Sequence, residues 1–327
     1  LITSGNAIRM AKNGLLVLGE GEVRDIHEAV YNSLLMYDKN IRIKLEGDLL
    51  LFKKELSSRG GLFLDEGNTI EQTLVNQITK QAVTKEIPQM QVGVSYLNNY
   101  YDIVDDIERI SGSSATIFQL VDDKMLRIST TVKKLDGKRA VGTYIPSDSV
   151  VYKTLMRGET FRGKAYVVND WYLTAYTPLR DIDGEIIGAL YVGQTMLNAQ
   201  VQDFITNTKV GPGYFYVYGS KGEYLIHPAK KPDASIFNDV PVFKDHQKGF
   251  LNYNENAENK IAYTRPIKDW GVNLAVTLNT KDLIAGQDIK MAKNSILVGL
   301  VVIAAGIIVT IFLVRSINNP LKVLADK

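Results

Sequence analysis

Twenty consecutive residues near the C-terminal end of the sequence carry no charge, no proline and no amide side chain. The run, residues 295–314, reads SILVGLVVIAAGIIVTIFLV. At 1.5 Å per residue, a helix of this length measures ~30 Å, the thickness of the hydrocarbon core of a bilayer. The alternative is a buried helix of a globular core, but such helices are usually shorter and keep a polar stripe. The run therefore predicts one transmembrane helix, Ser295–Val314.

The residues after this run, 315–327, read RSINNPLKVLADK. Pro320 is suited to the first turn of a new helix, and Leu321 and Leu324 give that helix an apolar side. The stretch resembles the opening of a HAMP linker, the parallel four-helix element on the cytoplasmic side of receptor transmembrane helices. This resemblance implies a plasma-membrane protein with its large domain extracytoplasmic, a homodimer, and a cytoplasmic signalling domain with kinase partners beyond Lys327. A first transmembrane helix is expected upstream of Leu1.

The composition excludes several classes of function. The 327 residues are 45% hydrophobic and 23% charged, as in ordinary globular protein, and suggest about two domains. A net charge of +2 provides no whole-chain field toward nucleic acid, so no nucleic-acid partner is expected. The absence of cysteine rules out disulfides and thiolate metal sites.

The first third of the chain is predicted to be helical. From about Glu22 to Arg59 apolar residues recur every three or four positions, which is typical of a long amphipathic helix that ends at Gly60-Gly61. Further helices are predicted over residues 69–84 and 94–110. Residues 22–110 thus form a helical stalk with connecting helices, after an uninformative segment, 1–21. The apolar stripe of the long helix must pack on its own domain or on a partner copy.

Beyond Ser114 the apolar period changes to two, which predicts strands. The string Thr174–Leu179 and its following hairpin parallel Ala262–Ile267, so we interpret residues 111–197 and 198–290 as two copies of one module. The predicted fold class is α+β: a long helix and two antiparallel-sheet modules before the transmembrane helix. The strands are expected at 115–120, 125–132, 140–144, 163–168, 171–179, 186–192, 213–218, 224–227, 249–253, 261–267 and 272–278, with a helix at 198–207.

Several ordered strings resemble the Cache 3/Cache 2 fusion sensor domain of methyl-accepting chemotaxis receptors and some sensor kinases. The resemblance implies two PAS-like (Cache) modules, one membrane-distal and one membrane-proximal, that sense a small molecule without catalysis or cofactor. One departure is the short loop Pro146–Ser149, which bears on what caps the distal pocket. The strings are NQITKQAVTKEIPQMQVG (76–93), SSATIFQ (113–119), KMLRISTTVKKLDGKRAVGTYIP (124–146), GETFRGKAYVVNDWYLTAYTPL (158–179), GEIIGALYVG (184–193) and VGPGYFYVYGSKGEYLIHP (210–228).

No catalytic motif is present: the sequence has no Walker loop, HExxH or GxSxG, and only three histidines. Neither an enzyme nor a metal site is therefore expected. Three alternatives stay open: the sensor region of a histidine kinase or cyclase, a membrane-tethered extracytoplasmic enzyme, and an adhesive ectodomain.

Strand alternation predicts which side chains meet a ligand in the distal module. One face of 171–177 carries hydroxyls, and Arg127, Ser129 and Thr131 are expected to share a face of 125–131. Arginine suits a carboxylate, and tyrosine and threonine hydroxyls can orient it, so a small organic anion is predicted. The candidate ligand-binding residues are Arg127, Ser129, Tyr144, Arg162, Lys164, Tyr172, Thr174 and Tyr176.

The run Arg127-Ile128-Ser129-Thr130 is also similar to the Arg-x-Ser-His pattern of Cache 3 sensors in citrate and dicarboxylate kinases. Thr130 stands in place of the histidine, so that ligand class is not transferred. The proximal module has a second set of candidates, for which sheet packing is the competing reading: Tyr216, Tyr224, His227, Tyr263 and Arg265.

Overall fold

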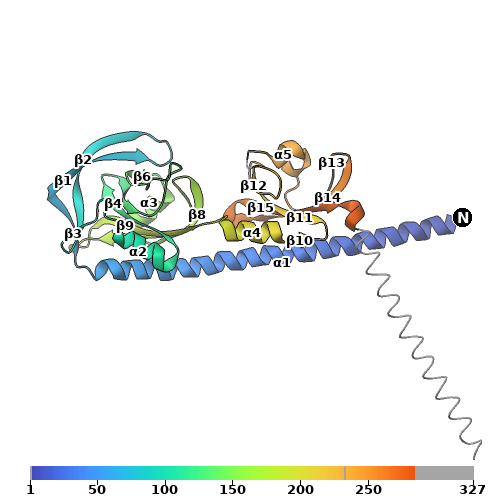
Figure 1. Ribbon diagram of the computed structural model, residues 1–327, viewed down its shortest axis with the longest axis horizontal. Helices are drawn as coiled ribbons and strands as arrows, with labels where there is room; N and C mark the ends of the chain where they lie inside the picture. The colour runs from blue at the N-terminus through green and yellow to red at the C-terminus, as the bar shows by residue number, and fades with distance from the viewer. Residues whose placement is uncertain (1, 232, 284–327) are drawn as a thin grey trace, which may run out of the picture. The chain divides into compact units, whose positions relative to one another are not determined.

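The computed structural model describes residues 2–231 and 233–283 (Figure 1). The predicted transmembrane helix 295–314 and linker 315–327 lie outside these residues. Within the described part, no helix combines the length and hydropathy that a bilayer crossing requires. Two compact units are present, residues 31–204 and a second unit that joins residues 2–30 to the chain from 205 onward.

Helix α1 (Ile2–Ser57) contributes residues to both units. It confirms the long amphipathic helix and starts well before the predicted Glu22. The chain leaves the helix at Gly60, whose φ of 124° lies in a region that side-chain-bearing residues rarely adopt. Val30, Leu34, Leu45 and Phe52 are buried along one side of α1.

The unit 31–204 is built on a nine-stranded sheet with the order β3-β2-β1-β6-β5-β4-β9-β8-β7. All neighbours are antiparallel except β1 and β6, where Val75 pairs with Thr143 in a parallel register, so the sheet is mixed rather than purely antiparallel. The strands are β1 (Leu62–Asn76), β2 (Ala82–Val92), β3 (Ser95–Tyr96), β4 (Ser114–Val121), β5 (Lys124–Thr130), β6 (Thr143–Ile145), β7 (Phe161–Val167), β8 (Asp170–Arg180) and β9 (Ile186–Thr195).

The helix predicted over 69–84 is wrong, because this segment belongs to the β1–β2 hairpin. Thr73 pairs with Thr84 and their hydroxyls lie 2.9 Å apart. β-branched residues such as Ile70, Thr73 and Val75 favour the pleated surface, and pairing along the whole hairpin outweighed the weak three-to-four periodicity. Lys80, with φ 63°, lies in the turn.

The helix predicted over 94–110 is only partly correct. Helix α2 spans Asp102–Ser111, and the residues before it form the short strand β3 and turns, in which Asn99 has φ 60°. Gly112 ends α2 in the left-handed conformation and donates its N–H to the Glu108 carbonyl at 2.7 Å. Ile103, Val104 and Ile107 pack inward.

Helices cover both faces of the sheet. In Figure 1 the second half of α1 runs along one face, which we call the outer face, and α3 (Val150–Met156) lies on the other, the inner face. Ser149 caps α3 by accepting the N–H of Val151 at 3.1 Å. The sequence predicts no helix here, because seven residues are too few to show a period.

The second unit contains a six-stranded sheet with the order β10-β11-β15-β14-β13, to which β12 is added on β11. Its predicted strands are confirmed, and the repeated strings lie in the hairpins β8–β9 and β14–β15. The elements are β10 (Lys209–Val210), β11 (Gly213–Gly219), β12 (Tyr224–Ile226), α5 (Ile236–Asp239), η1 (Pro241–Lys244), β13 (Gly249–Glu255), β14 (Glu258–Ile267), η2 (Lys268–Trp270) and β15 (Val272–Asn279). Helix α4 (Ala199–Asn207) precedes them.

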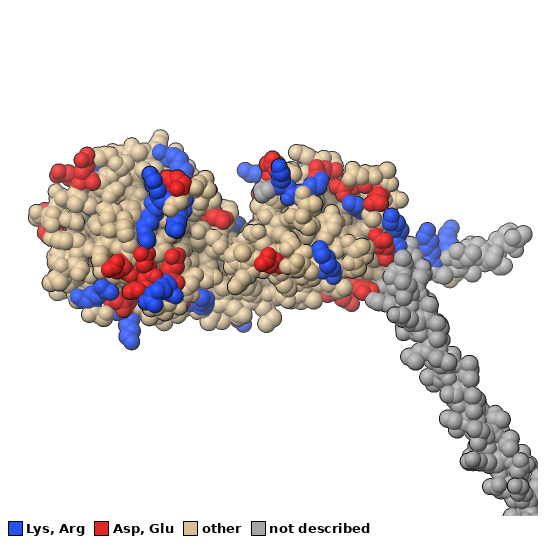
Figure 2. Space-filling view, in the orientation of Figure 1, with Lys and Arg blue, Asp and Glu red and all other residues tan. Residues whose placement is uncertain are grey.

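Charges of both signs lie interspersed on the face of each unit shown in Figure 2. Asp106 and Arg109 on α2 form one exposed pair of the unit 31–204, with 2.9 Å between their charged groups. Such exposed pairs contribute little to stability.

Candidate ligand-binding site

Arg127 is the most unusual buried residue of the unit 31–204. Its side chain is fully buried on the inner face, among the core residues Phe118, Met125, Tyr176 and Tyr191. The central carbon of its guanidinium lies 4.8 Å from the centroid of the Phe118 ring. A charged group in such surroundings is costly unless it is paired.

The hydrogen bonds of Arg127 leave one edge of its guanidinium unused. Nη1 donates to the hydroxyl of Thr143, whereas Nε and Nη2 are buried and have no hydrogen-bond partner among the described residues. Burial lowers the pKa of the Arg127 guanidinium, and the nearest opposing influences are tyrosine hydroxyls rather than carboxylates. In the described part of the chain, no carboxylate pairs with it.

Other arginines of this chain show what that edge binds. Arg42 uses Nε and Nη2 together to hold both carboxylate oxygens of Asp38, at 2.7 and 3.1 Å. Arg139 lies near Arg127 in sequence but is paired in full, because Asp105 accepts two hydrogen bonds from it at 2.7 and 2.9 Å. Arg127 therefore presents a fork of two donors that fits a carboxylate.

Tyrosines surround this fork. The rings of Tyr176 and Tyr191 are tilted against each other with 4.8 Å between their centroids, and the hydroxyl of Tyr191 lies 3.2 Å from the hydroxyl of Ser114. Burial raises the pKa of Tyr176 and of Tyr191 well above the usual value, so both remain neutral hydroxyls. Tyr172 is half-buried on the same face.

Four of the eight sequence-predicted residues lie together on the inner face: Arg127, Tyr172, Thr174 and Tyr176. Thr174 donates its hydroxyl to the Gly163 carbonyl at 2.8 Å, which ties β8 to β7. The other four lie on the outer face or its margin: Ser129, Tyr144, Arg162 and Lys164.

A β-bulge separates Ser129 from Arg127. The register of β4 and β5 shifts between Ile117 and Phe118, so that Arg127 pairs with Phe118 and Ser129 with Ile117. Because Ile128 is an extra residue on its strand, simple alternation fails and the two side chains face opposite ways. The expectation that they share a face is therefore wrong, and the Ser129 hydroxyl bonds the Tyr100 carbonyl instead.

The basic pair Arg162 and Lys164 does share a face, as alternation predicts, but that face is the outer one. Their strand partners are Ala175 and Leu173, on the side away from Tyr176. Arg162 is held by Glu46 of α1, and the ammonium of Lys164 lies 4.0 Å from the centroid of the Trp171 ring. Neither converges with Arg127.

The proximal candidates also divide between two faces. Tyr263 and Arg265 contact Glu28 of α1, on the face opposite Tyr216. Tyr216, Tyr224 and His227 cluster, with ring centroids between 4.8 and 6.1 Å apart. The Tyr216 hydroxyl is buried without a hydrogen-bond partner among the described residues. Tyr214 and Tyr218 share this face of β11 with Tyr216, inside a packed core.

His227 is held as a neutral acceptor. Its Nδ1 accepts the N–H groups of Ala229 and Lys230 at 3.0 and 2.9 Å, so the ring proton resides on Nε2. Burial, aided by the charge of Lys230, lowers the pKa of His227 to about 4. Among the described residues no group of three or more potential ligands could hold a metal.

Sequence reasoning missed three contributors to the inner-face site: Phe118, Thr143 and Tyr191. Phe118, Thr143 and Tyr191 lie in predicted strands, where nothing in the local sequence distinguishes them from ordinary sheet residues. The pairing of β5 with β4 and β6 brings Phe118 and Thr143 to Arg127, and the pairing of β4 with β9 adds Tyr191.

The sequence profile described as the Cache 3/Cache 2 fusion domain matches residues 10–295. Similar solved structures include the sensory domain of the Campylobacter jejuni chemoreceptor Tlp3 (14% identity, 85% of this chain and 99% of that chain covered, TM-score 0.47). The periplasmic domain of RsbU from Chlamydia trachomatis is also similar (12% identity, 86% of this chain and 98% of that chain covered, TM-score 0.48). So is the ligand-binding domain of Mlp24 with asparagine (12% identity, 82% of this chain and 99% of that chain covered, TM-score 0.43). A search among curated proteins found no match.

Proposed function

The chain belongs to the Cache 3/Cache 2 fusion domain family, and from this premise we propose that it is the ligand-sensing and transmembrane signalling region of a chemoreceptor. The described residues form its extracytoplasmic part. Residues 295–314 cross the plasma membrane, and residues 315–327 begin the HAMP linker that leads to the signalling domain. The ligand is a small organic anion with a carboxylate, bound in the unit 31–204.

The observation that carries the ligand assignment is the unused edge of Arg127. Leaving a guanidinium buried with Nε and Nη2 unpaired costs several kcal/mol, on the order of 3–5 kcal/mol for an uncompensated buried charge. A carboxylate that bonds both atoms removes this cost, as Asp38 does for Arg42. The surrounding rings of Phe118, Tyr176 and Tyr191 provide the apolar walls that ligand sites usually have.

The ligand reaches Arg127 beneath α3. This helix has only seven residues and covers the inner face with two buried side chains, Val151 and Leu155. Closure of α3 over the ligand changes the packing on β8, and the sheet transmits the change to α1 through the Arg162–Glu46 pair. A ligand shifts the equilibrium between the open and closed positions of α3 only if its affinities for the two states differ.

The receptor works as a homodimer whose contact includes α1. Met36, Ile43 and Leu50 are 66%, 61% and 68% exposed, although they are large apolar side chains. Their spacing of seven residues places them on one stripe of the helix, as in a two-helix seam. A second copy of the chain is the partner that matches such a repeat.

Calorimetry on the full chain in nanodiscs tests the ligand site, with a panel of small carboxylates and amino acids. We expect at least one carboxylate to bind and Arg127→Met to weaken it by about a hundredfold, the loss of a charged hydrogen-bonded pair. Arg109→Met, which removes an exposed ion pair on α2, is the matched control and should leave affinity unchanged. Binding that survives Arg127→Met, or the absence of any binding carboxylate, would refute the assignment.

The dimer is tested separately by disulfide formation, since the chain has no cysteine of its own. Ile43→Cys should give crosslinked dimers under mild oxidation. Leu135→Cys, at a loop position that is 90% exposed, is the control and should not. Equal crosslinking of both variants, or none of Ile43→Cys, would argue against the α1 contact.

A further inference from the structure

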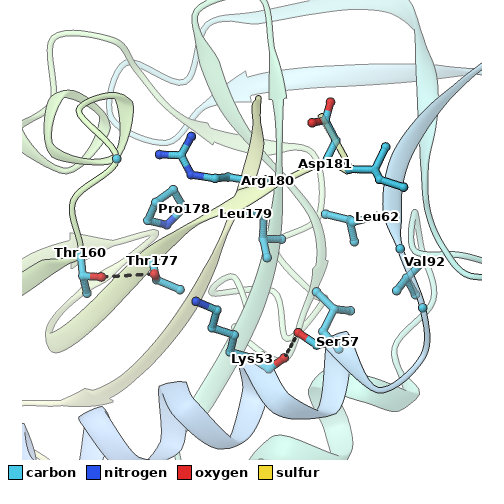
Figure 3. Close-up of a pocket in the computed structure, with 15 residues that line it drawn as sticks. Lys53, Ser57, Leu62, Val92, Thr160, Thr177, Pro178, Leu179, Arg180 and Asp181 are labelled. Carbon is cyan, nitrogen blue, oxygen red and sulfur yellow. Dashed lines mark hydrogen bonds between the residues drawn. The ribbon is translucent and has the colours of Figure 1, made fainter. Parts of the chain in front are cut away.

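A cavity of the unit 31–204 lies apart from Arg127, at the C-terminal end of α1. Its volume is about 520 Å³, within the range of small-molecule sites. The end of α1, the Gly60–Gly61 turn, the end of β8 and the loop before β7 form its walls (Figure 3). None of its lining residues belongs to the inner-face core around Arg127.

One side of this cavity is cationic. In Figure 3 the ammonium of Lys53 and the guanidinium of Arg180 lie on the same side as the Thr160–Thr177 hydroxyl pair, whose oxygens are 3.2 Å apart. Lys53 comes from α1 and Arg180 from β8, so the tertiary structure alone brings them to one cavity.

These two cations are not neutralised by the protein. Among the described residues, neither Lys53 nor Arg180 forms an ion pair, and Arg180 donates only to the Gly184 carbonyl, at 2.7 Å. The one carboxylate of the lining, Asp181, is committed to its own turn, where Oδ1 accepts the N–H groups of Asp183 and Glu185 at 3.0 and 2.9 Å. The cavity therefore carries a surplus of positive charge.

The opposite side is apolar. Leu56, Leu62, Val92 and Leu179 line it, and each is at most 8% exposed. Gly60, Gly61 and Gly158 leave the rim without side chains. A ligand that fits both sides has an oxyanion head and a short aliphatic tail.

We infer that this cavity is a second ligand site, for a small amphiphilic anion whose oxyanion is bound by Lys53, Arg180 and the Thr160–Thr177 hydroxyls. The tail lies against the leucines and Val92. The head is a carboxylate or a phosphate monoester, which share this recognition. Because the site uses none of the residues assigned to the Arg127 site, either can fail without the other.

Binding is measured on the full chain in nanodiscs, with empty nanodiscs as the reference for partitioning. The probes are pentanoate and pentyl phosphate, with acetate and inorganic phosphate as tail-less counterparts and pentanol as the head-less one. We expect pentanoate or pentyl phosphate to bind at least about tenfold more tightly than its counterparts, since both sides of the cavity contribute. The tighter of the two identifies the head group.

Variants assign that binding to the cavity. Lys53→Gln with Arg180→Gln should weaken it at least about tenfold, the loss of two charged donors. Lys54→Gln, the neighbouring lysine outside the lining, and Arg127→Met should leave it unchanged. Both substituted side chains are exposed, so the melting temperature of the double variant should stay near that of the parent.

Photolabelling gives an independent location. A diazirine derivative of pentanoate should label Leu56, Leu62 or Ile182 in a saturable way. The inference is overturned if no probe binds above the empty-nanodisc reference, if the double variant binds as the parent does, or if the label is confined to Phe118, Met125 and Tyr152.

Discussion

The guanidinium of Arg127 lies over the ring of Phe118, with 4.8 Å between its central carbon and the ring centroid, and both side chains are fully buried. A desolvated contact of this kind stabilises by about 2 kcal/mol. Burial of an unpaired charge costs more, about 3–5 kcal/mol. Phe118 therefore orients Arg127 without compensating for its burial, as expected of a binding group rather than a structural one.

Arg127→Met should stabilise the ligand-free protein, because it replaces a partly unpaired buried charge by an apolar side chain of similar length. We expect the free energy of unfolding to rise by about 1–3 kcal/mol, measured by denaturant unfolding of the detergent-solubilised chain. Arg139→Met is the comparison and should lower it, since Asp105 loses its bidentate partner. If both variants are destabilised alike, Arg127 has a structural role.

The stability of the second unit should depend on pH through His227. Its folded-state pKa is lowered from 6.5 to about 4, so the unfolded chain binds the proton more readily. The contribution is fully present above pH 6.5 and is lost as the pH falls toward 4. Hydrogen exchange of residues 213–255 should show this loss in the parent. The loss of protection at low pH should be weaker in His227→Asn, whose side-chain oxygen can still accept the two backbone N–H groups. An unchanged pH slope in that variant would show that His227 is not the responsible group.

Two tyrosines of the second unit should respond oppositely to loss of the hydroxyl. The hydroxyl of Tyr216 is buried without a described partner, so Tyr216→Phe should be neutral or stabilising. The hydroxyl of Tyr253 lies 2.6 Å from that of Thr277, so Tyr253→Phe should cost about 1 kcal/mol. Thermal unfolding of the two variants side by side checks this. A destabilised Tyr216→Phe would show that its hydroxyl has a partner, such as a buried water.

Two glycine-to-alanine substitutions should change the stability in opposite directions, one at a close contact between strands and one inside a helix. A Cβ at Gly188 would lie 2.1 Å from the carbonyl oxygen of Phe118, so Gly188→Ala must displace β4 or β9. We expect a cost of about 3 kcal/mol and weakened carboxylate binding, because Phe118 supports Arg127. Gly21→Ala, inside α1 with open space around it, should instead stabilise by up to about 1 kcal/mol. Melting temperatures that shift in the same direction would contradict this.

Most strands and the long helix could be predicted from the sequence. The spacing of apolar residues along α1 and the alternation in β4, β8 and β15 are local properties that the chain carries whatever its surroundings. The β1–β2 hairpin could not be recognised in this way, because Thr73 and Thr84 become strand residues through pairing with one another. The family could also be recognised from the sequence, because its motifs are continuous strings of residues and, like strand alternation, need no tertiary contacts to be seen.

The sequence by itself thus determined the long helix, most of the strands, the family and the two faces of each regular strand. Only the tertiary structure decided which face each residue occupies: the bulge at Ile128 turns Ser129 away from Arg127, and the register of β7 with β8 places Arg162 on Glu46. The tertiary structure also decided which charged residues are paired: Asp105 forms an ion pair with Arg139, whereas no described carboxylate pairs with Arg127. Local periodicity is set by neighbours along the chain, whereas the pairing of a buried charge depends on residues far apart in sequence.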